Sequence, residues 1–417
     1  MFVPSLQDDR FWRRMALLLF LCLSLVVLIT FRNYGLIWEE VIQKNYGEHL
    51  LHWYASGFFG SQALTFGNSF LYGGFFEIVA QLATRISPLG LYETRHLVTA
   101  GFGLLAIVST YRIGSNILSP AAGFFSALFL ALTPVFYGHL FNNSKDIPFT
   151  ALCTLALYFV IRTYDALPRI PNALLVKCGI AIGLCMGVRV GGVIVAGYMV
   201  LFWGWWMVQY ARSEGRGGQS PPFLGDIVRQ LGSILLIAWV VMLAFWPWAL
   251  ISPVLNPWIA LQATANFQWP GLVFFNGDEV VATDLPWTYL PTWLSISLPE
   301  FYLVTLLAGV LCGIRFVAKK TPIFKYGAKS SKTALLLFAI CFPVVSAILL
   351  GSTVYEGMRQ FLFMLPPLAV VAGISLVEFL NLTRERWLKQ TVIGLTTASI
   401  LVTAVDMIRL HPYNPLL

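Results

Sequence analysis

The chain has 417 residues, of which 58% are hydrophobic and only 11% are charged, and its mean hydropathy is +0.75. Soluble proteins carry roughly 25% charged residues, so this composition excludes a set of soluble domains and predicts an all-α integral membrane protein. The net charge of +8 does not indicate a nucleic-acid partner, because the basic residues lie between apolar runs and form no patch interleaved with aromatic side chains.

The apolar runs predict about eleven transmembrane helices, because a helix needs roughly 20 mostly apolar residues to span a bilayer. In chain order the predicted spans are 15–32, 96–112, 119–138, 147–164, 173–188, 191–210, 230–251, 298–317, 333–351, 360–381 and 390–408. Basic residues precede the first run, which has no small-x-small cleavage site, so we interpret it as an uncleaved anchor. Residues 1–417 are therefore predicted to form a single transmembrane domain, with no soluble domain after the last helix.

The distribution of Lys and Arg predicts which side of the membrane each loop faces. With the N-terminus in the cytoplasm, 19 of the 27 basic residues fall inside and the others outside. Two predicted outer segments are long, 33–95 and 252–297. The first has aromatic, partly amphipathic stretches that predict helices lying in the membrane interface, and the second is rich in Pro and Trp, which predicts an ordered interfacial loop. The longest inside loop, 211–223, has the composition of a linker.

Two adjacent carboxylates, Glu39 and Glu40, follow the first predicted span on the outer side. A partly dehydrated carboxylate at a lipid–water boundary can act as a general base. The simpler interpretation is that both are solvated, or that they favour a helix N-terminus through the helix dipole. The residues alone leave both interpretations open.

Polar residues crowd the short outer turn between the third and fourth predicted spans. They are His139, Asn142, Asn143, Ser144, Lys145 and Asp146. Asp146 comes shortly before Pro148 and is expected to cap the helix that begins there. A cap does not account for the other polar residues, so the turn also predicts binding of phosphate or of a divalent metal ion.

Arg189 and Arg359 are basic residues on the predicted outer side, where Lys and Arg are scarce. Arginine is well suited to a phosphate oxyanion, so both are candidate phosphate ligands. The alternatives are that Arg359 contacts lipid headgroups and that Arg189 pairs with a carboxylate. The six cysteines lie in apolar runs without a CxxC or Cys/His pattern, which favours packing over disulfides or a zinc site.

Taken together, these segments resemble the glycosyltransferase type C superfamily, in the branch that holds protein O-mannosyltransferases and lipid A aminoarabinose transferases. The outer acidic pair is followed by "YETRHLVTAGFGLLAIVSTYRIG", "NNSKDIPFTALCTLALYFVIR", "LPWTYLPTWLSISLPE" and "EGMRQFLFMLPPLAVVAG". The resemblance covers residues 10–411. Each motif is short, and their order and spacing make the resemblance specific.

The resemblance implies transfer of a sugar from a polyprenyl-phosphate donor to a hydroxyl of a glycan, lipid or protein. The reaction would take place at the outer face of a bacterial inner membrane, with one displacement that inverts the anomeric carbon. Glu39 stands where many members have Asp, and Glu40 follows it, so either is implied to be the catalytic base. The implied roles of the other matching positions are second-loop acidic residue for Asp146 and phosphate ligand for Arg359, with Lys145 or Arg189 beside it.

Three questions stay open at this point. Many members have a soluble outer domain after the last helix, whereas this chain ends at "RLHPYNPLL", so either the acceptor is recognised without that domain or a partner protein supplies it. A transporter or lipid flippase would show internal repeats and helices broken at mid-membrane, and we find no repeat. An inactive accessory subunit of the same fold is the third class.

Overall fold

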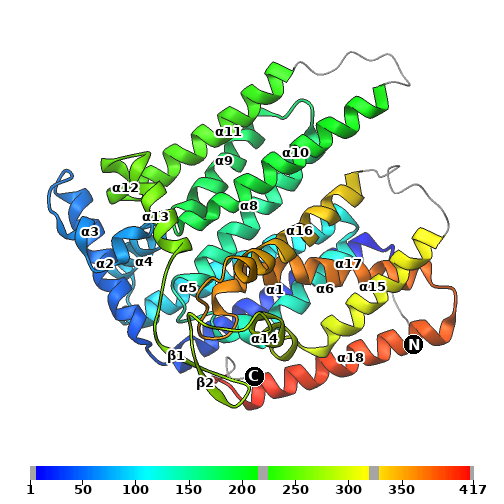
Figure 1. Cartoon of the computed structure of the whole chain (residues 1–417). Helices are drawn as coiled ribbons and strands as arrows, with labels where there is room; N and C mark the ends of the chain where they lie inside the picture. Colours follow the sequence, from blue (N-terminus) through cyan, green and yellow to red (C-terminus); the bar gives the residue numbers. More distant parts are fainter. Residues whose placement is uncertain (1–5, 215–223, 319–327, 414–417) are drawn as a thin grey trace.

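The computed structural model describes residues 6–214, 224–318 and 328–413, which form a bundle of helices with one short hairpin of strands (Figure 1). The helices of the bundle are α1 (Asp9–Thr30), α5 (Leu91–Ile117), α6 (Pro120–Ala131), α7 (Pro134–Gly138), α8 (Asp146–Ala166), α9 (Asn172–Met186), α10 (Val193–Glu214), α11 (Leu224–Ala244), α15 (Glu300–Ala318), α16 (Ala328–Leu349), α17 (Leu365–Leu382) and α18 (Arg386–Arg409). Every predicted span overlaps one of them. The prediction of an all-α membrane protein is confirmed.

Helix length and composition give a smaller number of membrane-spanning helices than the sequence predicts. Among the described residues, eight helices are long and apolar enough to span a bilayer. A ninth span results if α14 (Tyr289–Ser297) and α15, bent by 105° at their junction, count as one. Helices α6 and α9 are shorter than a usual span. The count of about eleven therefore stays a prediction.

Helix starts follow the capping residues of the sequence. The Asp8 side chain accepts a hydrogen bond from the backbone N–H of Phe11 at 3.0 Å and begins α1. The Ser119 hydroxyl accepts from the N–H of Ala122 at 3.3 Å, and Pro120 occupies the first position of α6. These are the residue types preferred at a helix N-terminus.

The two long predicted outer segments lie at one end of the bundle. Segment 33–95 folds into α2 (Trp38–Ala55), α3 (Gln62–Thr65) and α4 (Phe75–Ile86). After α12 (Pro247–Ile251), the second segment contains α13 (Leu255–Ala265), β1 (Leu272–Phe275), β2 (Asp278–Val281) and α14, so it is more regular than the predicted loop. Strands β1 and β2 are antiparallel, with Leu272 opposite Val281. The predicted inside linker lies mostly outside the described residues, since 215–223 are not among them.

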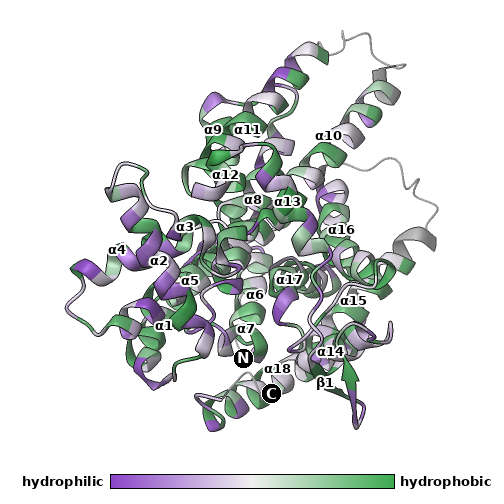
Figure 2. Ribbon diagram, turned by 60° about the vertical axis from the view of Figure 1, so that its left-hand side comes forward, coloured by the Kyte–Doolittle hydropathy of each residue, from purple (hydrophilic) through white to green (hydrophobic). Residues whose placement is uncertain are grey.

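Helices α8 and α17 form the centre of the bundle. Of the spanning stretch of each, 78% and 83% respectively is buried inside the protein, against 17% for α1. Helix α17 packs on α6 and α15, and α8 packs on α5 and α9. Gly373 lets α17 approach α6 closely, because a Cβ there would lie 2.8 Å from the carbonyl oxygen of Ala122. Figure 2 shows apolar residues along the long helices and a more hydrophilic α2.

Candidate active site

The site is built around Arg359, which is 8% exposed. It begins the 3₁₀ turn Arg359–Met364 that leads into α17. Its guanidinium reaches three carboxylates: Nε donates to Asp146 Oδ2 at 2.9 Å, Nη1 donates to Glu356 and Nη2 donates to Glu39. These carboxylates come from three separate parts of the chain, so Arg359 ties α2, α8 and α17 together at the end of the bundle that carries the long segments.

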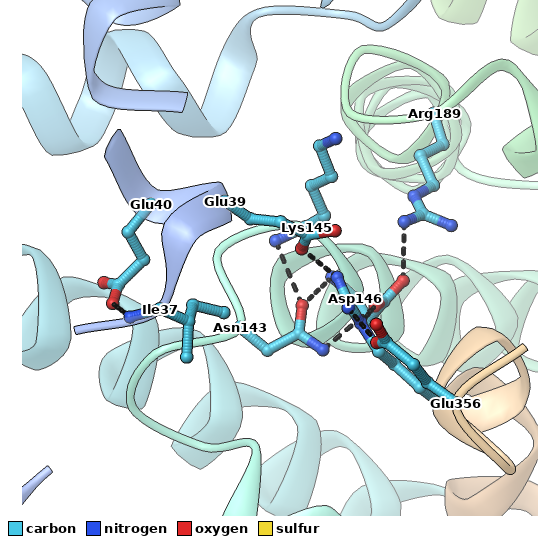
Figure 3. Close-up of polar contacts among 9 residues, drawn as sticks. Ile37, Glu39, Glu40, Asn143, Lys145, Asp146, Arg189 and Glu356 are labelled. Atoms are coloured by element: carbon cyan, nitrogen blue, oxygen red, sulfur yellow. Dashed lines mark hydrogen bonds and ion pairs between the residues drawn. The ribbon is translucent and has the colours of Figure 1, made fainter. Parts of the chain in front are cut away.

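Asp146 is a buried acceptor for two arginines. Its Oδ1 lies 2.7 Å from Arg189 Nη2, and Asn143 Nδ2 donates to Oδ2 at 2.9 Å (Figure 3). The expectation that Asp146 caps α8 is wrong, because Asp146 is the first residue of the helix and its own N–H donates to Asn143 Oδ1 at 2.8 Å. The Asn143 amide can accept from the backbone and donate to the carboxylate at once, which leaves Asp146 free to face the arginines.

Glu39 and Glu40 are adjacent but lie in different surroundings, since consecutive helical residues point in directions about 100° apart. Glu40 is 1% exposed; it accepts the N–H of Ile37 at 3.2 Å and lies 3.1 Å from His96 Nε2. Glu40 therefore fixes the start of α2 against α5. Glu39 turns the other way (Figure 3). Its carboxylate pairs with Arg359, and its side chain is 15% exposed.

Tyr72, which the sequence analysis did not single out, contacts two basic side chains through its ring. Lys145 Nζ is 4.7 Å from the centre of its ring, and the Arg189 guanidinium carbon is 5.8 Å from the same point. Such contacts stabilise a cation over an aromatic face. Burial, with a smaller contribution from the positive charge of Arg189, lowers the pKa of Lys145.

The glycines after Tyr72 hold it in place. A Cβ on Gly73 would lie 2.1 Å from the carbonyl oxygen of Gly187, and the same carbonyl accepts the N–H of Phe75 at 3.0 Å. Only glycine fits this close approach of two backbones. The "YGG" triplet between aromatic residues is the sequence signal that could have located Tyr72 at the site.

The cluster has balanced charge. Its six charged residues, three of each sign, are Arg359, Arg189, Lys145, Glu39, Asp146 and Glu356. His139 is close by, and burial, together with the nearby positive charge of Arg359, lowers its pKa to about 4, so it is neutral at pH 7. In the part of the chain that the structure describes, no group of three His, Cys, Asp or Glu side chains is arranged to hold a metal ion. The divalent ion that the sequence left open stays a prediction.

The structure thus brings together five of the six residues singled out from the sequence, and places Glu40 apart with His96. Glu356, from the same turn as Arg359, joins the cluster. Both Glu356 and Gly357 have positive φ angles, of 56° and 63°, and this sharp turn directs the Glu356 carboxylate to Arg359. An uncommon backbone conformation at a non-glycine residue often marks a functional site.

Comparisons with known proteins agree with the fold. Residues 77–212 match the family described as dolichyl-phosphate-mannose-protein mannosyltransferase. The structure is similar to ArnT from Cupriavidus metallidurans in the apo state, with a TM-score of 0.55 and 19% identity over 91% of this chain and 62% of that one. It is also similar to the apo oligosaccharyltransferase of Archaeoglobus fulgidus, with a TM-score of 0.60 and 13% identity over 99% of this chain and 57% of that one.

A second structure of the Archaeoglobus fulgidus enzyme, AglB in complex with an inhibitory peptide and a dolichol-phosphate, matches with a TM-score of 0.50 and 15% identity over 81% of this chain and 47% of that one. This chain thus spans about three fifths or less of the length of the solved structures that it resembles. No curated protein matches it in sequence. At these identities the structural likeness establishes the fold.

Proposed function

Since the chain resembles the type C glycosyltransferases in fold and, over 77–212, in sequence, we propose that it transfers a sugar from a polyprenyl-phosphate donor to an acceptor hydroxyl. The reaction takes place at the outer face of a bacterial inner membrane and inverts the anomeric carbon. The sugar is a hexose or a pentose, and the acceptor is a glycan, a lipid or a protein.

One observation carries this proposal: Glu39 shares Arg359 with the buried Asp146. Asp146 holds the guanidinium in place through Nε, and Arg189 binds the other oxygen of Asp146. In the described residues Glu39 has no second hydrogen-bond partner besides Arg359, and its carboxylate is more exposed than that of Asp146. Arg359 is thus held in place by Asp146, and it can exchange its other partner, Glu39, for a phosphate.

The proposed reaction balances charge within this cluster. The acceptor oxygen attacks the anomeric carbon, the bond from that carbon to the phosphate oxygen breaks, and Glu39 takes the hydroxyl proton. The leaving phosphate gains one negative charge as Glu39 loses one. Arg359 can then move its charge-assisted hydrogen bond from Glu39 to the phosphate, which stabilises the leaving group where the charge develops. A departing phosphate needs no proton from a second carboxylic acid, unlike the leaving group of a glycosidase.

Lys145 and Arg189 both lie near the Tyr72 ring and supply the remaining positive charge. We propose that they contact the phosphate from the side opposite Glu39. Asp146 acts as a positioning residue, because both of its ionic partners are arginines that face the donor.

The test is a transfer assay on the purified full chain with a panel of polyprenyl-phosphate sugars, in which release of polyprenyl phosphate is measured by mass spectrometry. We expect turnover by the unmodified protein and a 10²- to 10⁴-fold loss in E39Q, the range for a missing general base. E48Q is the matched control, because Glu48 is also on α2, its side chain is 46% exposed, and it pairs with Lys44 at 2.7 Å. E48Q should keep its rate within about twofold.

The outcomes separate the competing functions. Full activity of E39Q would contradict the assignment of the base. No turnover with any donor, despite folded protein, would favour an accessory subunit, and movement of intact donor across vesicles would favour a flippase. A chelator, followed by added Mg²⁺ or Mn²⁺, tests metal dependence in the same assay.

A further inference from the structure

A basic cavity lies at the end of the bundle opposite the candidate active site. It has a volume of about 580 Å³, is open on one side, and is lined by the first turns of α1, the last turns of α5 and α8, and the start of α6. Three arginines line it, Arg13, Arg112 and Arg162, together with one acidic residue, Asp9. This volume lies in the range of small-molecule binding sites.

A mostly apolar groove of about 520 Å³, whose lining also includes Ser109 and Lys177, continues from this cavity between α5, α8 and α9. The two spaces share Arg112, Tyr158 and Arg162. Leu105 and Leu155, which line the groove, lie seven residues before Arg112 and Arg162 respectively. With a rise of 1.5 Å per residue, both leucines lie about 10 Å deeper in the bundle than the arginines.

The apolar lining follows one face of each helix. On α5 the groove contains Leu105, Val108 and Arg112, and on α8 it contains Leu155, Phe159 and Arg162. Spacings of three, four and seven residues place side chains on one helical face. Each stripe is therefore apolar inside the bundle and ends in an arginine at its surface, and the two stripes run side by side because α5 packs on α8.

The arginines at this junction are available to a ligand. Within the described residues, neither Arg13 nor Arg112 forms an ion pair, and Arg162 donates a hydrogen bond to the Tyr158 hydroxyl at 2.9 Å. The nearby Asp165 is already held by Lys332 at 2.5 Å and by Asn116 at 3.0 Å. Asp9 alone does not balance three arginines, so the junction carries a net positive charge.

We propose that this cavity and groove form a binding site for an anionic phospholipid. The phosphate lies between Arg112 and Arg162, the rest of the headgroup occupies the basic cavity, and an acyl chain follows the apolar groove. Basic residues at the cytoplasmic ends of helices are common, but here they stand at the mouth of a continuous apolar groove. Basic pockets between transmembrane helices are suited to anionic lipid headgroups, whereas a soluble phosphate compound would leave the groove unused. The proposal does not depend on the transferase activity.

The test titrates the detergent-purified full chain with phosphatidylglycerol or phosphatidylcholine and counts bound lipids by native mass spectrometry. We expect tighter binding of phosphatidylglycerol, and an affinity about 30-fold lower in R112Q/R162Q, since each basic residue near an anionic lipid contributes about fivefold. The matched control is R384Q/R386Q, which removes the same charge from the end of the connection after α17 and from the first residue of α18, at the same end of the bundle. The affinity of this variant should stay within about twofold.

Folding is checked by the thermal unfolding of each variant in phosphatidylcholine, and R112K/R162K, which keeps the charge, should bind phosphatidylglycerol within about threefold of the unmodified protein. Equal affinity for the two lipids would overturn the proposal. So would an equal loss in R384Q/R386Q, which would indicate general surface charge. Displacement of phosphatidylglycerol by an equal concentration of glycerol phosphate would instead indicate a site for a soluble phosphate compound.

Discussion

Replacement of Asp146 by Asn tests whether this residue holds the arginines of the site. The carboxylate is 4% exposed and accepts from Arg359, Arg189 and Asn143 at 2.7 to 2.9 Å. The amide of D146N has nearly the same shape but no charge, and its NH₂ group cannot accept a hydrogen bond. One of the two arginines therefore loses its partner in a buried position.

Asp226 provides a control in an exposed ion pair. It lies in the first turn of α11, its side chain is 48% exposed, and it pairs with Arg229, 77% exposed, at 3.0 Å. Removing one member of a buried ion pair costs about 3–5 kcal/mol, whereas an exposed pair contributes at most about 1 kcal/mol. Each aspartate also interacts favourably with the N-terminus of its own helix, by about 0.3–1 kcal/mol. D146N should therefore lower the free energy of unfolding by about 3–6 kcal/mol, and D226N by no more than about 2 kcal/mol.

The difference can be measured by denaturant unfolding in mixed micelles, followed by the fluorescence of the 14 tryptophans. D146N should also lose transfer activity per folded molecule, because one of the two arginines is no longer held in place, whereas D226N should keep its activity. Equal destabilisation by the two variants would refute the reasoning. So would a D146N protein that is as stable and active as the original.

Three further predictions concern the surroundings of the site. E40Q should lower the free energy of unfolding by about 1–3 kcal/mol, because the Glu40 carboxylate is buried against His96. Its turnover per folded molecule should stay within a few fold of that of the unmodified protein. A larger loss of turnover than in E39Q would contradict this. G73A should unfold at a lower temperature and bind donor more weakly, since its Cβ would meet the Gly187 carbonyl at 2.1 Å; unchanged donor affinity would contradict this. The pKa of His139 is lowered from 6.5 to about 4 in the folded protein. Between these pH values the unfolded chain therefore binds more protons than the folded protein. The free energy of unfolding should fall by up to about 3 kcal/mol as the pH drops from 6.5 to 4. H139Q should flatten this dependence, and an unchanged pH profile would contradict the assignment.

The helices were predictable because their signal is local. An apolar run of about 20 residues has few alternatives to a helix in a membrane, where every backbone polar group must be satisfied within the segment. All eleven predicted segments are helical. The second outer segment was predicted as a loop but contains α13 and α14, because packing orders short helices that Pro and Trp content does not reveal.

The candidate site was predictable only in part. Arg359 and Asp146 were found because a basic residue outside and a crowd of polar residues at a helix start are both unusual. Their contact was not predictable from spacing, since they lie 213 residues apart. The separation of Glu39 from Glu40 likewise depends on the rotation of α2, which is set by the contact between Glu40 and His96 of α5.

The order of the site residues along the chain has a consequence for membrane insertion. Asp146 begins α8 and Arg189 lies in the connection between α9 and α10, so the two can neutralise each other soon after both are synthesised. Arg359 follows about 170 residues later, which at about 5–20 residues per second takes roughly 10–30 s. Glu39 has to wait through this interval without its arginine. A chain truncated before Arg359 would therefore contain α1 to α16 and still lack the residue that joins Glu39 to Asp146.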